Sequence, residues 1–499
     1  MTEFRSQALL HALRNTFLVM VAAFMLLPSN VVGQEVIARL DLDRKQPQPR
    51  YIEYISADGG IATMGNQSRK SSRYLAISKY DDGFNKTWSK TVMQQNGHSN
   101  VDLLAALGDN IYVFMSQYTP RDRTVRTSFS QFDLDGNQII DKKEIAELPN
   151  EKERRTDLKY VRSINKKKLL CYKNLDEGSK QEKILYYLFD AYSDEVISGE
   201  IVIPYPDDKF QLRKIMVSNA GQIYVLGKFF KVNRVKTPDD FGFKLYHFVP
   251  GEAKGAEVAV ELGALFITDL TLKIDRDENL FLAGFYSHRS TDQIIGTCFF
   301  RFDDGLNEVL RSSQRFNDDF LNRFMKERQI DRGKELQNFY LDNIILRSDG
   351  GVLLLAERFY TTSNSYVDMY GYWVDQRIYH FDEVIVNSVA ANGDLEWSAV
   401  VPKRQQSERR ERLSYIDIVS GANLFLIYGY EQRREPHTMY TNSIDFDGKV
   451  SSRSILIKNN GYDDIFYPRS SEQISNTEAL LVYYQERQKV FSIVKMAFD

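Results

Sequence analysis

Residues 341–356 read LDNIILRSDGGVLLLA and form the clearest copy of a unit that recurs along the chain. A mainly apolar run leads into the turn at 348–351, and an all-apolar run follows it. Asp-Gly and Asn-Gly sequences accept the positive φ of tight hairpin turns, so the turn indicates a strand reversal. A third run at 384–386, a second turn at 391–393 and a fourth run at 395–401 complete the unit. The unit therefore predicts a small antiparallel sheet of four strands.

The second strand of this unit recurs eight times, mostly as a continuous apolar run. The runs lie at residues 61–65, 111–115, 169–172, 223–227, 280–284, 352–356, 424–429 and 480–484. Continuous apolar runs are typical of strands that are buried on both faces. Because one such sheet is not stable alone, the repeats are expected to stack face to face. The sequence therefore predicts an all-β chain folded as a β-propeller of eight four-stranded blades, with seven blades as the alternative.

The two ends of the chain each contain an incomplete unit. The run at 36–42 precedes the first unit, whereas the last unit ends at Asp499 directly after its third strand. A sheet edge left bare invites aggregation. We therefore predict that residues 36–42 supply the fourth strand of the last blade, so that the propeller is closed by the N-terminal strand.

Two of the units carry a resemblance to known proteins. Residues 344–356 and 215–227 (IMVSNAGQIYVLG) resemble the Asp-Gly-Gly repeats of exported bacterial β-propellers. The likeness extends over nearly all of the chain after residue 33. It implies a structural kinship and supplies no catalytic residue.

The first 33 residues differ from the rest of the chain. Arg5 and Arg14 precede an apolar run at 17–27, and small residues follow at 31–33. This pattern predicts a secretory signal peptide cleaved after Gly33. The run is about half of the roughly 20 residues that a membrane anchor needs. We expect one propeller domain at residues 34–499, exported to the periplasm or secreted by a bacterium, with no membrane span after cleavage.

The overall charge and the cysteines exclude several classes of function. The net charge of −3 provides no concentrated basic field, which disfavours a nucleic-acid partner. Cys171 and Cys298 fall in the third and fifth units, so we expect two buried thiols that behave as small apolar residues. The six histidines show no metal-ligand spacing, and no phosphate-binding glycine loop or nucleophile elbow is present. We expect no metal, no cofactor and a monomeric chain.

Two stretches between the units have their own patterns. Phe316, Phe320 and Phe324 recur at four-residue spacing and predict an amphipathic helix of about three turns. We expect this helix to cover the rim of the propeller, with partner binding as the alternative. The charged run at 403–412 mixes basic residues with glutamates and is interpreted as a solvated connection between units.

The candidate binding residues lie in an aromatic stretch at 359–381, which we expect to be a loop. They are Tyr366, Tyr370, Tyr372, Trp373 and Arg377. Flat aromatic faces beside hydrogen-bonding groups suit sugar rings or protein side chains. The alternative is a lengthened hairpin whose aromatic residues pair across strands or pack on the neighbouring blade.

These residues predict a binding scaffold that recognises a protein or a glycan through loops at one face. An enzyme is the less favoured class. The alternative function is a glycan-active hydrolase or lyase with its site at the central channel. Its catalytic residues would come from different blades, because a glycosidase needs two carboxylates facing each other. No linear spacing in the sequence identifies such a pair.

Overall fold

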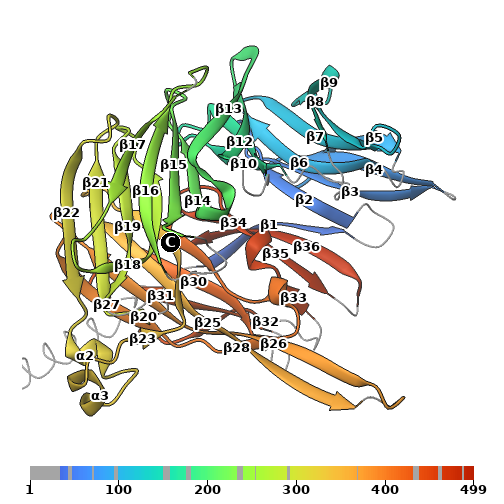
Figure 1. Cartoon of the computed structure of the whole chain (residues 1–499). Helices are drawn as coiled ribbons and strands as arrows, with labels where there is room; N and C mark the ends of the chain where they lie inside the picture. Colours follow the sequence, from blue (N-terminus) through green and yellow to red (C-terminus); the bar gives the residue numbers. More distant parts are fainter. Residues whose placement is uncertain are drawn as a thin grey trace, which may run out of the picture.

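A computed structural model describes most of the chain after residue 33. The described residues are 34–42, 48–69, 72–94, 99–149, 158–175, 181–232, 240–252, 254–288, 293–367, 369–430, 438–458, 464–485 and 488–498. The predicted signal peptide lies outside them. No helix in these ranges is long and apolar enough to cross a membrane. The described residues form nine antiparallel sheets, of which eight have four or five strands; these eight, here called blades 1 to 8, follow one another around a common centre (Figure 1), and the ninth pairs only β20 (Gln293–Ile294) with β23 (Leu336–Gln337).

Blades 1 to 4 each consist of consecutive strands. Blade 1 contains β2 (Gln48–Tyr54), β3 (Ile61–Arg69), β4 (Ser72–Tyr80) and β5 (Lys86–Gln94). Blade 2 contains β6 (Ser99–Leu107), β7 (Asn110–Thr119), β8 (Thr124–Asp133) and β9 (Gln138–Pro149). Blade 3 contains β10 (Lys159–Arg162), β11 (Lys168–Leu175), β12 (Gln181–Asp190) and β13 (Ser193–Pro206). After the 3₁₀ turn η1 (Asp207–Lys209), blade 4 contains β14 (Phe210–Val217), β15 (Ile223–Phe230), β16 (Phe241–Phe248) and β17 (Ala256–Val260).

Blades 5 to 8 follow the same order with additions. Blade 5 contains β18 (Phe266–Ile274), β19 (Leu280–Ser287), β21 (Gly296–Phe302) and β22 (Glu308–Arg315). Blade 6 contains β24 (Phe339–Leu346), β25 (Val352–Val367), β26 (Trp373–Val389) and β27 (Leu395–Val401), and β28 (Gln405–Ser407) also pairs with β26. After η2 (Arg410–Arg412), blade 7 contains β29 (Ile416–Ser420), β30 (Asn423–Tyr430), β31 (Thr438–Ile444) and β32 (Ser454–Lys458). Blade 8 contains β33 (Asp464–Phe466), β34 (Glu472–Gln473), β35 (Glu478–Gln485), β36 (Val490–Phe498) and β1 (Gln34–Leu42), with η3 (Pro468–Ser470) between β33 and β34.

The acidic turns between strands are held by their own side chains. Asp81 accepts a hydrogen bond from the backbone N–H of Asn85 at 2.7 Å, and Asp303 accepts the equivalent bond from Asn307 at 2.8 Å. The backbone hydrogen bond from Asn85 lowers the pKa of Asp81, and the hydrogen bonds from the Asn307 side chain and backbone lower the pKa of Asp303. The carboxylates therefore stabilise the turns, as turn chemistry predicts for Asp followed by Gly or Asn.

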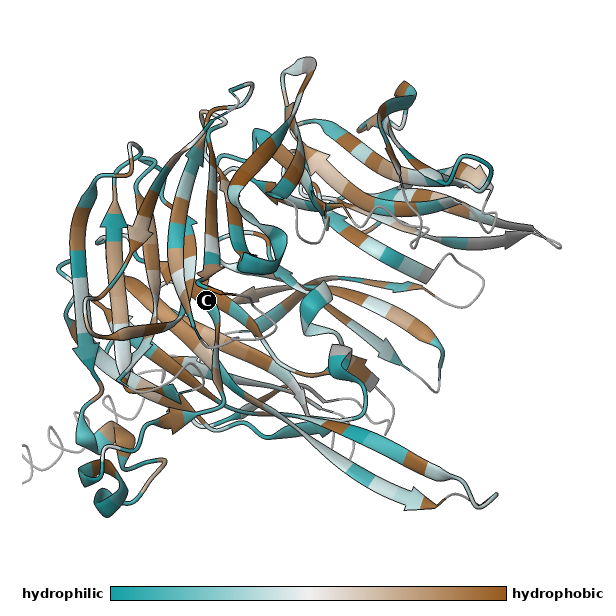
Figure 2. Ribbon diagram, in the orientation of Figure 1, coloured by the Kyte–Doolittle hydropathy of each residue, from teal (hydrophilic) through white to brown (hydrophobic). Residues whose placement is uncertain are grey.

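Apolar clusters fill every interface between neighbouring blades. Separate clusters join blades 1 and 2, 2 and 3, 3 and 4, 6 and 7, 7 and 8, and 8 and 1, and one larger cluster joins blades 4, 5 and 6. Cys171 and Cys298 are free and buried within them, which confirms their expected role. Figure 2 shows hydrophobic residues along the inner strands and hydrophilic residues at the turns.

The strands from the two ends of the chain lie side by side (Figure 1). β1 pairs antiparallel with β36, from Gln34 opposite Phe498 to Leu42 opposite Phe491. Leu42 is 1% exposed and belongs to an apolar cluster that also contains Ile61 of blade 1. The prediction that the N-terminal run is the fourth strand of the last blade is confirmed, and the propeller has eight blades.

The predicted three-turn helix is wrong in length. Two separate short helices form instead, α2 (Asp318–Leu321) and α3 (Glu327–Asp331). Asn317 caps α2 by accepting from the N–H of Phe320 at 2.8 Å, and a new cap at Lys326 begins α3. The phenylalanines nevertheless pack on one another, with ring centroids of Phe320 and Phe324 5.5 Å apart. Apolar spacing thus identified the buried face, while the caps determined where each helix begins.

Candidate interaction surface

A long hairpin extends from blade 6. The strands β25 and β26 continue beyond the blade as a ladder that runs from Phe359 opposite Phe381 to Val367 opposite Trp373. We call residues 359–381 the arm. Nine residues of extended strand span about 30 Å. Figure 1 shows the arm projecting away from the rest of the molecule.

The base of the arm is packed by its own aromatic residues. The rings of Phe359 and Phe381 lie 4.7 Å apart, and those of Tyr360 and His380 are stacked at 4.5 Å. β28 adds a third strand here, with Ser407 opposite Tyr379. The expected loop is therefore wrong, and the alternative of a lengthened hairpin with cross-strand aromatic pairs is confirmed for the base.

The tip of the arm has a different character. Tyr366 is 47% exposed, Tyr370 77%, Tyr372 71% and Trp373 75%, and Met369 is 89% exposed between them. Four of the five predicted binding residues therefore gather at one exposed tip. The fifth, Arg377, is also exposed but lies opposite Ser363, further down the arm. Sequence reasoning missed Met369, although its position between the tyrosines was a usable signal.

A buried polar network fixes the base of the arm to the connection that follows blade 6. The Lys403 Nζ lies 2.6 Å from a carboxylate oxygen of Glu357, and donates to the carbonyl of Phe381 at 2.9 Å and to Gln405 Oε1 at 2.7 Å. The Ser414 hydroxyl donates to Glu357 at 2.7 Å. Burial raises the pKa of Glu357 and lowers the pKa of Lys403, because each charge has been removed from water.

This network corrects the interpretation of the run at 403–412 as a solvated connection. Arg409 and Arg410 are exposed, but the Lys403 side chain is completely buried and Gln405 is 1% exposed. Lys403 can be buried because the carboxylate of Glu357 compensates its charge. The arm is thus rigidly anchored at its base.

The first strands of blades 4 and 6 each carry a charged residue at a β-bulge. β24 contains a bulge at Asp342, and β14 contains one at Arg213. A bulge re-aims the side chain of the extra residue. Asp417 of the neighbouring strand β29 accepts from the Asn343 amide at 3.0 Å. Asp342 is exposed and Asp417 half-buried, but the protein atoms crowded around them raise both pKa values, and the charge of Asp342 adds to the shift of Asp417.

Comparisons with known proteins bear on the fold alone. No protein-family model and no curated protein matches the chain. Among solved structures it is similar to the β-propeller domain of the Trilobed protease from Pyrococcus furiosus, with 11% identity over 83% of this chain and 99% of that one and a TM-score of 0.39. The Nup133 β-propeller domain from Vanderwaltozyma polyspora has 10% identity over 80% of this chain and 100% of that one, with a TM-score of 0.38. The α-L-arabinofuranosidase Arb93A from Fusarium graminearum has 9% identity over 64% of this chain and 93% of that one, with a TM-score of 0.28. These low identities concern architecture and carry no activity over to this chain.

Proposed function

We propose that the chain is an exported scaffold that docks a partner protein through the tip of the arm. The observation that supports this most strongly is the exposure of Tyr370, Tyr372 and Trp373 together at the end of a projecting hairpin. Tyr and Trp are the residues that dominate binding energy in protein interfaces. Large apolar groups gathered on an exposed surface are a typical mark of an interaction site.

The shape of the tip favours a protein over a glycan as its ligand. Small-molecule sites are concave and enclose most of the ligand. The arm is not concave: it is a projecting two-stranded ribbon, and the side chains at its tip are mostly exposed to solvent. A projection of this kind fits into a groove on a macromolecule, where aromatic anchors fill pockets of the partner.

The competing function, a glycan hydrolase at the central channel, is supported by the raised pKa values of Asp342 and Asp417. Glycoside hydrolysis requires two carboxylates that are free to act on the bond. Asp417 is already engaged by Asn343. We therefore place docking first. If the chain were a hydrolase with its site in the central channel, substitutions at the distant arm tip would leave its turnover unchanged. If the tip docks a partner, the same substitutions would weaken binding.

The docking proposal predicts that a photo-crosslinking side chain at Tyr370 captures one discrete partner in cells that produce the chain. Tyr192 is the matched control, because it is 78% exposed but lies on the turn after β12. With the purified partner, Tyr370→Ala combined with Trp373→Ala is expected to weaken binding by at least about thirty-fold, since one interface anchor alone contributes about 2 kcal/mol and the effects of two are not strictly additive. The melting temperature should stay unchanged, because neither side chain packs in a core cluster.

Two results would contradict docking through the tip. One is crosslinking of the same proteins from Tyr370 and Tyr192, which would show nonspecific capture. The other is loss of fold in the double variant, which would assign the tip residues a packing role. Tyr192→Ala provides the matched control for the binding measurement.

A further inference from the structure

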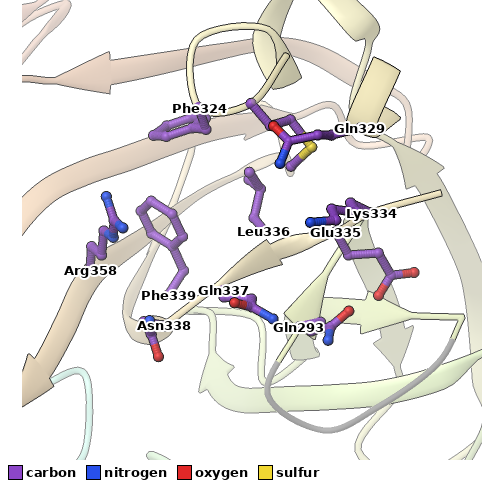
Figure 3. Close-up of a pocket in the computed structure, with 11 residues that line it drawn as sticks. Gln293, Phe324, Gln329, Lys334, Glu335, Leu336, Gln337, Asn338, Phe339 and Arg358 are labelled. Carbon is purple, nitrogen blue, oxygen red and sulfur yellow. The ribbon is translucent and has the colours of Figure 1, made fainter. Parts of the chain in front are cut away.

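A pocket of about 390 Å³ lies between the base of the arm and the insertion that contains α2 and α3 (Figure 3). One wall is the extended segment 334–339, which includes β23 (Leu336–Gln337) and pairs with β20 (Gln293–Ile294). Phe324 and its neighbours form the opposite wall, and Arg358 stands at one end. Its volume lies within the range of small-molecule sites.

The pocket offers flat apolar surface. Phe324 is half-buried, and its ring meets that of Phe339 edge to face, with centroids 5.4 Å apart. Leu336, on the wall formed by residues 334–339, is buried (Figure 3). Rings in this arrangement can receive the apolar C–H face of a ligand ring while polar groups reach its edge.

The polar part of the pocket consists largely of carboxamides. Four carboxamides line it beside the charged Lys334, Glu335 and Arg358, namely Gln293, Gln329, Gln337 and Asn338. Asn338 has φ of 64°, a left-handed conformation that Asn tolerates better than most residues and that often occurs at functional positions. A carboxamide both donates and accepts hydrogen bonds, as does a sugar hydroxyl. This match favours a ligand rich in hydroxyl groups.

Arg358 supplies a positive charge with unused hydrogen-bonding capacity. Its ion pair with Glu383 has an N–O distance of 3.4 Å, and its Nε is buried without an acceptor among the described residues. The Arg358 side chain is 38% exposed, so guanidinium nitrogens other than the buried Nε can donate to a ligand in the pocket. Both carboxylate oxygens of Glu335, the buried acid on the pocket wall, already accept hydrogen bonds, one from the Ser287 hydroxyl and one from the N–H of His288. Guanidinium groups bind carboxylates in a planar, bidentate geometry.

We propose that this pocket binds an acidic sugar. The carboxylate of a uronic acid pairs with Arg358, its hydroxyl groups exchange hydrogen bonds with the carboxamides of Gln293 and Gln337, and the apolar face of its ring packs against Phe324. The site is distinct from the arm tip. It does not depend on the docking proposal, so either can fail without the other.

The test is calorimetric titration of the purified chain with glucuronic and galacturonic acids, beside glucose and galactose. Both uronic acids or one of them should bind, and the matching neutral sugar at least about ten-fold more weakly, since a hydrogen bond to a charged group contributes about 1.5–3 kcal/mol. Arg358→Gln should weaken uronate binding by a similar factor. Arg126→Gln, on β8 of blade 2 and outside the pocket, is the matched control, because Arg126 also pairs with a glutamate at 3.4 Å; this variant should bind as the unchanged chain does.

A second variant keeps the test decisive if Arg358→Gln fails to fold. Gln337 is exposed, so Gln337→Ala should leave the melting temperature unchanged and weaken uronate binding several-fold. The proposal is overturned if no uronic acid binds, if neutral sugars bind equally well, or if a folded Arg358 or Gln337 variant binds as the unchanged chain does. Acetate binding as tightly as the uronic acids would also overturn it, because the pocket would then recognise a carboxylate and no sugar.

Discussion

Deletion of residues 34–42 is expected to lower the free energy of unfolding by about 5 kcal/mol or more, the largest effect we predict. The deletion removes β1, whose eight paired residues form the edge of blade 8. It also removes the fully buried Leu42, and loss of a buried leucine side chain alone costs about 2–5 kcal/mol. The row of backbone groups on β36 would be left bare and prone to aggregation.

Urea denaturation of the shortened chain, beside the chain that begins at Gln34, measures this effect. Added in trans, a peptide with the sequence QEVIARLDL should restore stability by pairing with β36, because a free sheet edge accepts a matching strand. A peptide of the same composition in scrambled order is the control. An unchanged denaturation midpoint after the deletion would show that β1 contributes nothing to blade 8.

Replacement of Lys403 by methionine is expected to destabilise the chain by about 3–5 kcal/mol, because it leaves the carboxylate of Glu357 buried without its counter-charge. Methionine has nearly the same length, so little packing is lost. Adding Glu357→Gln should recover most of the loss, since a neutral amide costs much less to bury than a carboxylate.

Lys231 provides the matched control for this substitution. It pairs with Asp240 at 3.0 Å, but its side chain is 70% exposed. Exposed ion pairs contribute about 1 kcal/mol or less, so Lys231→Met should leave the unfolding free energy nearly unchanged. Equal effects of Lys403→Met and Lys231→Met in urea denaturation would show that burial of the Lys403 pair does not matter for stability.

Much of the fold was predictable because its signals are local. The apolar run at 352–356 and the turn at Ser348–Gly351 lie within one stretch of sequence, and each has a direct counterpart in the structure. The edge strand β1 was predictable from the number of strands in each unit. The last unit lacks a fourth strand, whereas the run at 36–42 precedes the first unit and belongs to no other. The two short helices were not predictable from apolar spacing, since the caps at Asn317 and Lys326 decide their bounds.

The candidate sites were predictable only in part. Aromatic composition identified Trp373 and its neighbours. The continuous pairing of β25 with β26 along the arm was not predicted, because the arm strands are largely hydrophilic and lack the apolar runs that mark the other strands. The burial of Lys403 depends on Glu357, which lies far away in the sequence, so no local pattern distinguished it from a solvated lysine. No local pattern identified Arg358 either, because the pocket that it lines also needs Phe324 and β23, which come from other segments of the chain.

Hydrogen exchange measured along the arm tests the central claim most directly, namely that the exposed tip of the arm extends beyond the blades and is available to a partner. An isolated two-stranded ribbon is marginally stable, so amides in residues 363–375 should exchange on the order of a hundred-fold faster than those in 352–357. Addition of the docked partner should slow the fast group selectively. Equal protection of both segments in the isolated chain would show that the arm is packed and would contradict its role as a docking element.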